Sequence, residues 1–152
     1  MRYSKLMKER IRRVSVLFRE LGVEVLESES SDDSYSAEFE SDDGFHGGLF
    51  ISRESKFLEI GYSFILSPAF SEFVRLRMEH VMQSAYEYGA YMSVVAGEEE
   101  INLSLFSKIY YAGLNYFSLK ETMRDFREVV DEVQDLFELP GESGDGGYHE
   151  DS

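Results

Sequence analysis

Apolar side chains recur at alternating steps of four and three near the C-terminal end of the chain, which predicts an α-helix over residues 118–137. Its apolar stripe consists of Leu119, Met123, Phe126, Val130, Val133 and Phe137. Ser118 is the predicted N-cap, Glu121 would complete a capping box, and Pro140 and Gly141 end the helix. Burial of these side chains would contribute about 10 kcal/mol or more, so the helix must lie on an apolar surface.

A similar stripe near the N-terminus predicts a helix over residues 3–21, with Gly22 ending it. The stripe consists of Met7, Ile11, Val14, Phe18 and Leu21. Beyond it, apolar and polar residues alternate in short runs that polar turns separate, which is typical of antiparallel strands with one solvated face. These runs are residues 23–29, 35–40, 45–51 and 58–66.

The pattern then returns to helical spacing over residues 67–88, where Ser67 is the predicted N-cap, Pro68 takes the first helical position and Gly89 ends the helix. Two further strands follow at residues 90–96 and 100–112, and Gly97-Glu98-Glu99 joins them as a tight hairpin. The predicted order is therefore α-β-β-β-β-α-β-β-α. This order predicts an α+β fold, with an antiparallel sheet and helices packed on one face.

The domain organisation follows from the same pattern. Residues 1–138 are predicted to form a single domain, because no linker divides them and their length suffices for a core. Residues 139–152 are rich in glycine and acidic residues and are predicted to be a disordered acidic tail. The chain has no run of 18 apolar residues and no apolar signal segment, which predicts a cytoplasmic protein without a membrane span.

Charge is strongly negative and uneven along the chain. The net charge of −15 argues against a nucleic-acid partner, since phosphates bind to cationic surfaces. Seven of the fifteen basic residues nevertheless fall within the first helix, and nine acidic residues without a basic one lie between Glu24 and Asp43. We expect these two regions to face each other, within the fold or across a dimer. Contact of the basic helix with nucleic acid or anionic lipid is the alternative.

The chain offers few groups for catalysis or for a cofactor. It has no cysteine, and His46, His80 and His149 have no metal-ligand spacing around them. Residues 44–48 are glycine-rich but lack the lysine and the strand-to-helix setting of a phosphate loop, so a closely approached or bulged strand explains them better. We therefore expect no enzyme, no metal and no cofactor.

The helix over residues 67–88 has apolar residues on more than one face, which exceeds what contact with one sheet requires. A homodimer about a two-fold axis would bury the excess, and methionines pack adaptably at such contacts. The strand over residues 58–66 presents a second apolar face. The candidate interface residues are Phe70, Phe73, Val74, Leu76, Met78, Val81, Met82, Tyr86, Leu58, Ile60, Tyr62 and Phe64.

The segment from Met78 to Phe137 carries a resemblance to two related groups of proteins. In it a helix ends in Ala85-Tyr86-Glu87-Tyr88-Gly89, a hairpin with an acidic turn follows, and Phe117-Ser118-Leu119-Lys120 opens the last helix. This order resembles type III secretion chaperones and the YbjN-like family of bacterial sensory-transduction regulators. The resemblance implies a dimeric, non-enzymatic protein that holds a client peptide on apolar surfaces. The basic first helix departs from what either group would lead us to expect.

The sequence thus predicts a non-enzymatic protein-binding module, chaperone-like or regulator-like, that holds a partner peptide on apolar sheet and helix surfaces, as a homodimer. Strand addition or capture of a helix in a groove would be the mechanism. Two alternatives stay open: a small enzyme with an unrecognised carboxylate or histidine site, and a nucleic-acid or lipid-surface protein that acts through its basic first helix.

Overall fold

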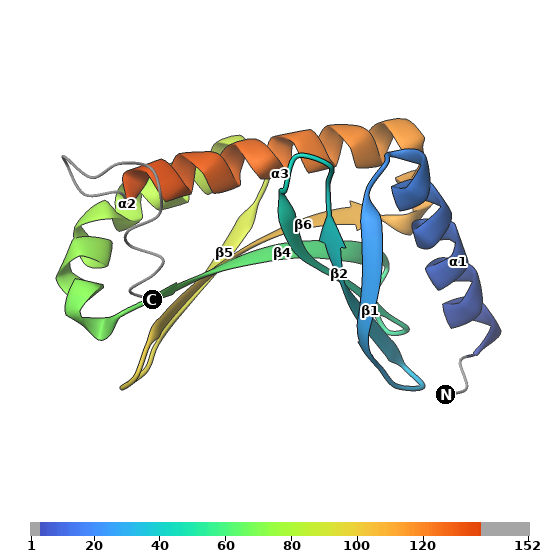
Figure 1. Ribbon diagram of the computed structural model, residues 1–152, viewed down its shortest axis with the longest axis horizontal. Coiled ribbons are helices and arrows are strands. Elements are labelled where there is room, and N and C mark those ends of the chain that lie inside the picture. Colours follow the sequence, from blue (N-terminus) through green and yellow to red (C-terminus); the bar gives the residue numbers. More distant parts are fainter. Residues whose placement is uncertain (1–3, 138–152) are drawn as a thin grey trace. The chain divides into compact units, whose positions relative to one another are not determined.

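The computed structural model describes residues 4–137 and has the predicted order of helices and strands (Figure 1). The predicted acidic tail at residues 139–152 lies outside the described residues. The elements are α1 (Lys5–Glu20), β1 (Glu24–Ser30), β2 (Ser34–Glu40), β3 (His46–Ser52), β4 (Phe57–Leu66), the 3₁₀ turn η1 (Pro68–Phe70), α2 (Ser71–Glu87), β5 (Tyr91–Ala96), β6 (Ile101–Tyr110), the 3₁₀ turn η2 (Tyr111–Gly113) and α3 (Tyr116–Leu136). The predicted α+β class is confirmed.

The strands form one six-stranded antiparallel sheet in the order β1-β2-β3-β4-β6-β5. Strands β1 to β4 follow one another as a meander, because short turns such as the one closed by Ser31 N–H and the Ser34 carbonyl connect them. After α2 the chain returns as β5, and β6 then takes the position between β5 and β4. Consequently β1 and β5 are the two edge strands, which the sequence alone did not reveal.

The described residues belong to two compact units. Among them, unit 1 comprises residues 4–61 and 107–124, and unit 2 comprises residues 62–106 and 125–137. Strands β4 and β6 and helix α3 therefore contribute residues to both units.

The core of unit 1 lies between the first helix and one face of the sheet. Strand β2 buries every second residue, as the alternation predicts, and Phe39 stacks on Phe18 of α1 with ring centroids 5.9 Å apart. Helix α1 contacts β1 and β3, so the basic and the acidic region of the sequence are neighbours. The buried side chains of this core are Met7, Val14, Phe18, Tyr35, Ala37, Phe39, Leu49, Ile51, Leu58, Ile60, Ile109, Leu114, Leu119 and Met123.

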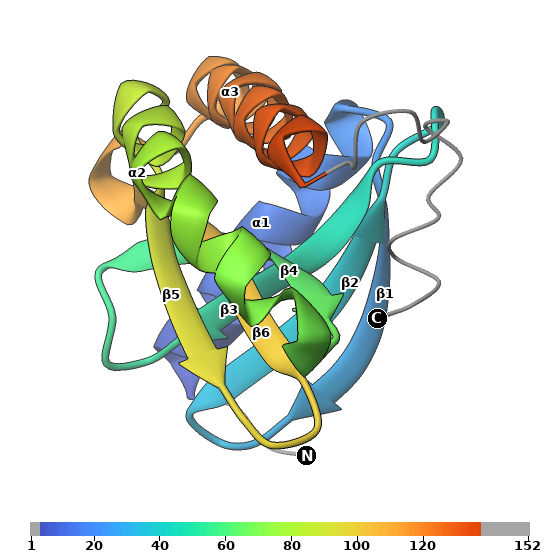
Figure 2. The same cartoon turned by 90° about the vertical axis from the view of Figure 1, so that its left-hand side faces the viewer.

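The core of unit 2 is built from β4, β6, α2 and the second part of α3. Figure 2 shows α2 and α3 on the same face of the β5–β6 hairpin. Phe137 is 1% exposed and packs edge-on against Phe64, with ring centroids 5.9 Å apart. The other buried apolar side chains are Leu66, Val74, Val81, Ala85, Ile101, Leu103, Leu105, Phe126, Val129, Val130 and Val133. The predicted apolar stripe of the last helix is thus confirmed in full.

The start of α3 corrects the predicted N-cap. The helix begins at Tyr116, and Asn115 precedes it. The Asn115 side chain accepts a hydrogen bond from Ser118 N–H, and Ser118 Oγ accepts one from Asn115 N–H, both 2.9 Å long. Ser118 is therefore the third helical residue of a reciprocal capping box whose N-cap is Asn115. Glu121, which the sequence assigned to the box, forms an ion pair with Arg124 instead.

Glycines in β3 permit a close approach of neighbouring strands. A Cβ atom on Gly47 would lie 2.6 Å from the Gly61 carbonyl oxygen and 2.8 Å from Cζ of Phe39. Both distances are shorter than real contacts, so only glycine fits at this position. The expectation that close strand approach, and not a phosphate loop, explains this glycine cluster is confirmed for Gly47.

Candidate functional site

Several residues of the predicted interface belong to the core. Strand β4 is an inner strand, and side chains on one of its faces are covered. The same holds for the face of α2 that points at the sheet. The structure places Leu58, Ile60, Phe64, Val74 and Val81 at 5% exposure or less, and Tyr62 is half-buried. The five buried side chains hold the fold together and do not reach a surface.

A second group from the predicted interface packs at the start of α2. Phe70 and Phe73 meet edge-on at 6.1 Å, and Phe73 also approaches Phe137 at 6.3 Å. The guanidinium of Arg77 lies 3.7 Å above the Phe73 ring and covers it from solvent. Phe70 and Phe73 are therefore only half-exposed, and their aromatic area is already used within unit 2.

Three predicted interface residues of α2 remain exposed: Leu76 at 64%, Met82 at 57% and Tyr86 at 81%. Successive residues of an α-helix are about 100° apart, so a row at steps of four stays on one side. Ser84 and Phe73 face α3, where they contact Glu132 and Phe137. Met78, Met82 and Tyr86 consequently form a row on the flank of α2 that is turned away from α3.

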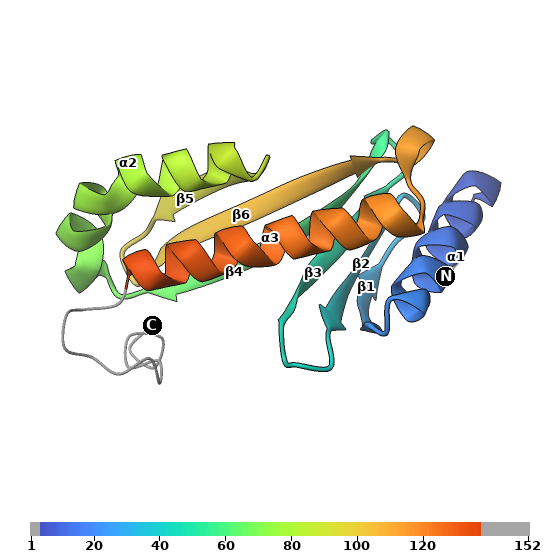
Figure 3. The ribbon, with the colours of Figure 1, turned by 90° about the horizontal axis from the view of Figure 1, so that it is seen from above.

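Strand β5, which the sequence analysis did not include in the interface, contributes the largest continuous exposed stretch. Each of its residues is exposed or half-exposed, including Tyr91 at 53%, Val94 at 39% and Val95 at 63%. Figures 2 and 3 show α2 running beside this strand, with which it is also in contact. Among residues 4–137 no further strand lies beyond β5. The apolar flank of α2 therefore borders an open sheet edge.

The hydrogen-bond pattern of the hairpin shows which backbone groups this edge offers. Gly97 N–H donates to the Glu100 carbonyl oxygen at 2.9 Å, and β5 pairs with β6 without a register shift. In an antiparallel pair, hydrogen-bonded positions alternate. Counting back from Gly97, the backbones of Val95, Ser93 and Tyr91 face β6. The backbone N–H and C=O groups of Met92, Val94 and Ala96 therefore point outward, where a further strand could pair with them. We call these three residues together with Met78, Met82 and Tyr86 the outer surface of unit 2.

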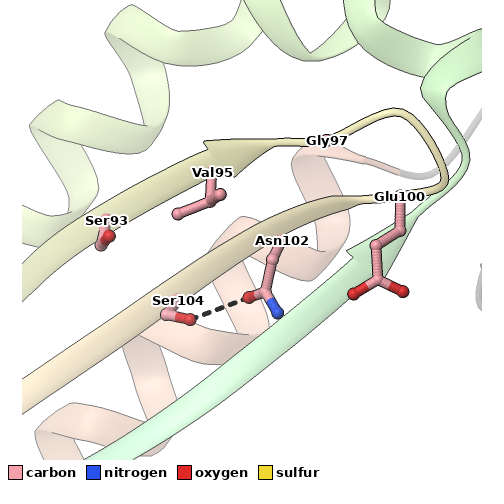
Figure 4. A pocket seen from close by; sticks show the side chains of 6 residues that line it. All are labelled: Ser93, Val95, Gly97, Glu100, Asn102 and Ser104. Atoms are coloured by element: carbon pink, nitrogen blue, oxygen red, sulfur yellow. Dashed lines mark hydrogen bonds between the residues drawn. The ribbon is translucent and has the colours of Figure 1, made fainter.

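An open groove of about 460 Å³ lies on the hairpin beside this edge (Figure 4). Ser104 Oγ donates to Asn102 Oδ1 at 3.0 Å and is 2.9 Å from Ser63 Oγ, so a short row of polar groups crosses the strands. The groove is lined by Ser93, Val95, Gly97, Glu100, Asn102 and Ser104. Four of its six lining residues have polar side chains, whereas the apolar residues on the other face of β6 are buried.

A carboxylate of α3 fixes α2 against α3. Glu132 accepts hydrogen bonds from Ser84 Oγ and from Tyr88 Oη, each 2.9 Å long. The bond to Glu132, together with burial and the surrounding carboxylates, raises the pKa of Tyr88. Ser84 in α2 and Tyr88 at its C-cap lie far in the sequence from Glu132 in α3, so no sequence spacing could reveal this contact.

The basic first helix uses two of its arginines inside unit 1. Arg10 donates to the carbonyl oxygens of Ser52 and Ser55, each at 2.9 Å, and lies 4.3 Å above the Tyr111 ring. Arg13 donates to the carbonyl oxygens of Tyr111 and Leu114. These arginines satisfy main-chain acceptors in turns and do not pair with the acidic region that the sequence analysis had opposed to them.

The two histidines of the described residues lie on different elements. His46 lies on β3 in unit 1 and His80 on α2 in unit 2, and both side chains are exposed. His149 lies outside the described residues. Within residues 4–137 no three acidic, histidine or cysteine side chains are grouped in a way that could hold a metal ion. In the same range no helix combines the length and the apolar character that a membrane crossing needs.

Comparison with known proteins gives a likeness in fold. No protein-family model matches the chain, and no curated protein matches it either. The chain is similar to the crystal structure of an uncharacterized protein from Methanothermobacter thermautotrophicus, with a TM-score of 0.60 and 16% sequence identity. The match covers 86% of this chain and 99% of the other. At this identity the likeness concerns the fold alone.

Proposed function

We propose that the protein is a non-enzymatic protein-binding module that holds an extended segment of another polypeptide on the outer surface of unit 2. The segment would add to β5 as a further strand and pack its side chains against the flank of α2. The resemblance to type III secretion chaperones and YbjN-like proteins is part of this proposal, since such chaperones hold extended client segments.

The observation that carries the proposal is the unprotected edge at β5. Proteins normally protect an edge strand with charges, prolines or bulges, because outward backbone groups invite pairing with another chain. The sequence of β5, Tyr91–Ala96, contains no charged residue and no proline, and its pairing with β6 has no bulge. Val94 of β5 and Met82 of the neighbouring helix α2 have exposed apolar side chains. An edge of this kind is suited to receiving a strand.

Selection of binders from a random peptide library, followed by amide hydrogen exchange, tests the proposal. We expect the selected peptides to slow exchange at Met92, Val94 and Ala96, whose N–H groups point outward. Val94→Lys places a charge on the edge and should weaken binding about tenfold or more. The matched control is Leu26→Lys on β1, where the replaced side chain is also exposed. Peptides that protect other amides and bind the Val94→Lys variant equally well would refute the proposal.

The homodimer that the sequence predicts is the alternative occupant of this surface. Two copies could pair through β5 and bury Met82 and Tyr86 between them. Sedimentation velocity over a range of concentrations would reveal such a dimer. If it forms through this surface, Met82→Glu and Val94→Lys should both dissociate it, whereas Leu26→Lys should leave it intact.

A further inference from the structure

We propose that the segment held at β5 has a defined polarity: it runs antiparallel to β5 and carries lysine or arginine at its N-terminal end, followed by alternating apolar and small polar residues. This inference rests on the proposed function and specifies the partner's chemistry. Three features of unit 2 lead to it: the outward backbone of β5, the different character of its two sides, and the acidic turn at one end.

The outward backbone favours an antiparallel neighbour. Met92, Val94 and Ala96 are alternate residues of an unbulged strand, and an antiparallel partner can exchange both N–H and C=O with each of them. Antiparallel pairing is slightly more stable per residue than parallel pairing. A segment of about six residues would match the length of β5, which spans Tyr91–Ala96.

The two sides of β5 predict the alternation of side chains. Met92 and Val94 lie opposite Leu105 and Leu103 and therefore share the face that packs beneath the helices. Ser93 and Val95 lie opposite Ser104 and Asn102 and line the groove, in which four of six residues have polar side chains. A strand added to this edge continues both faces, because successive side chains alternate. Every second residue of the partner would thus meet the apolar flank of α2, and the residues between would lie beside the groove.

The acidic turn determines which end of the partner is basic. Glu98, Glu99 and Glu100 follow β5 directly and are exposed. Within the described part of the chain none of these three carboxylates takes part in an ion pair. An antiparallel partner would place its N-terminal end beside this turn. Lysine or arginine there would pair with the glutamates, whereas an acidic residue would be repelled.

The same charges disfavour a second copy of this chain. A two-fold axis that pairs the outward residues would pass through Val94, so that Met92 of one copy faces Ala96 of the other. The turn at Glu98–Glu100 of each copy would then lie close to Glu87, which ends α2 and is exposed. Like charges would meet at both ends of the pairing, and each copy has a net charge of −15. A basic, extended peptide avoids this repulsion.

Three labelled peptides test the inference by fluorescence anisotropy with the full chain. The first is Lys-Lys-Val-Ser-Val-Ser-Val, the second replaces both lysines by glutamates, and the third moves the lysines to the C-terminal end. We expect the first to bind about tenfold more tightly than the second and about threefold more tightly than the third. Equal affinity of the first and second peptides would refute the claim that the partner has a basic end. Tighter binding of the third peptide would refute the antiparallel direction.

Backbone pairing is tested on the peptide, where a substitution cannot unfold the protein. Two versions of the first peptide carry N-methyl groups on alternate residues, one version on each alternate set. Only one set points toward β5, so we expect one version to bind about tenfold more weakly than the other. Equal binding of both versions would overturn strand addition.

The complementary variant reverses the charge of the β5–β6 turn by combining Glu98→Lys, Glu99→Lys and Glu100→Lys. We expect it to prefer the glutamate peptide, while the control Glu38→Lys with Glu40→Lys on β2 keeps the preference for lysine. Unchanged preference in the turn variant would refute the inference, as would a β5-dependent dimer that the first peptide does not displace. If none of the peptides binds, the inference is wrong, whereas the library selection decides the proposed function separately.

Discussion

The two edge strands of the sheet differ in how they deal with exposed backbone. Strand β1 in unit 1, Glu24–Ser30, contains three glutamates, and its pairing with β2 shifts register between Glu27 and Glu29. Charges and irregular pairing both discourage the approach of another strand. Strand β5 in unit 2, Tyr91–Ala96, has neither feature. One edge is thus protected and the other is open, although both belong to the same antiparallel sheet.

The two units also differ in what their charged side chains contact. Arg10 and Arg13 donate to carbonyl oxygens in turns and so satisfy acceptors that would otherwise need water. In unit 2 the carboxylates of the three glutamates in the β5–β6 turn take part in no ion pair within the described residues. Two arginines of unit 1 thus bind within the fold, whereas the turn glutamates of unit 2 form no ion pair among the described residues. The two units therefore differ in which polar groups they leave exposed at a sheet edge.

The largest expected effect is a loss of stability in unit 2. It tests whether the unit that carries the open edge is well packed. Phe137→Ala removes the ring that packs against Phe64 and Phe73, and Phe137 is 1% exposed. We expect the free energy of unfolding to fall by about 3–5 kcal/mol in urea titration. The control is Phe117→Ala, whose side chain is 76% exposed and should change stability by no more than about 0.5 kcal/mol. Equal effects of the two variants would mean that unit 2 is loosely packed and that its exposed edge reflects poor packing.

The second effect concerns the tight strand packing of unit 1. Gly47→Ala would place its new methyl group 2.6 Å from the Gly61 carbonyl oxygen, which is a backbone atom and cannot swing aside. We expect a loss of about 1–3 kcal/mol in the free energy of unfolding, measured by thermal and urea denaturation. Gly113→Ala is the matched control, because nothing lies within 4 Å of its Cβ position. A neutral Gly47→Ala variant would show that β3 and β4 can separate easily and that unit 1 is less rigid than its packing indicates.

The hydrophobic pattern predicted the elements well, and it predicted the stripe of α3 without an error, because periodicity reports directly which face of an element is buried. It could not predict which strand is an edge. Met92, Val94 and Val95 make β5 look like an inner strand, and the position of β6 between β4 and β5 depends on contacts between residues distant in the chain. Only the strand order shows that β5 is an edge strand.

The candidate site was predicted in part for the same reason. Met82 and Tyr86 were identified from an apolar excess on α2, and both are exposed. Leu58 and Ile60 were assigned to the interface although they are core residues. The sequence pattern of an apolar strand face is the same whether a helix of the same chain or a partner covers it. The contact of Glu132 with Ser84 joins two helices and has no local signature.

A smaller effect is expected at Tyr111 in unit 1. Its hydroxyl oxygen is buried and has no hydrogen-bond partner among the described residues, and burial raises the pKa of Tyr111 to about 12 against the lowering effect of Arg10. A raised pKa means that the folded state holds the proton more tightly, so this contribution to stability is present below pH 10 and is lost between about pH 10 and 12.

Tyr111→Phe removes both the orphan hydroxyl and its ionisation. We expect the variant to be neutral or up to about 1 kcal/mol more stable at pH 7, with a weaker loss of stability between about pH 10 and 12. Urea titrations at several alkaline pH values measure both effects. Destabilisation at pH 7 would show that the Tyr111 hydroxyl makes a stabilising contact in the folded protein.

The smallest effect on stability tests the contrast between the edges directly. Val94→Lys on β5 and Leu26→Lys on β1 each replace an exposed apolar side chain, so each should change the free energy of unfolding by no more than about 0.5 kcal/mol. Their effects on association should differ, because a lysine protects an edge that was open but adds little to one already protected. In concentrated solution followed by light scattering, we expect Val94→Lys to aggregate more slowly than the unmodified protein and Leu26→Lys to behave like it. If both lysines slow aggregation alike, β1 is as open as β5, and glutamates with a register shift do not suffice to protect an edge.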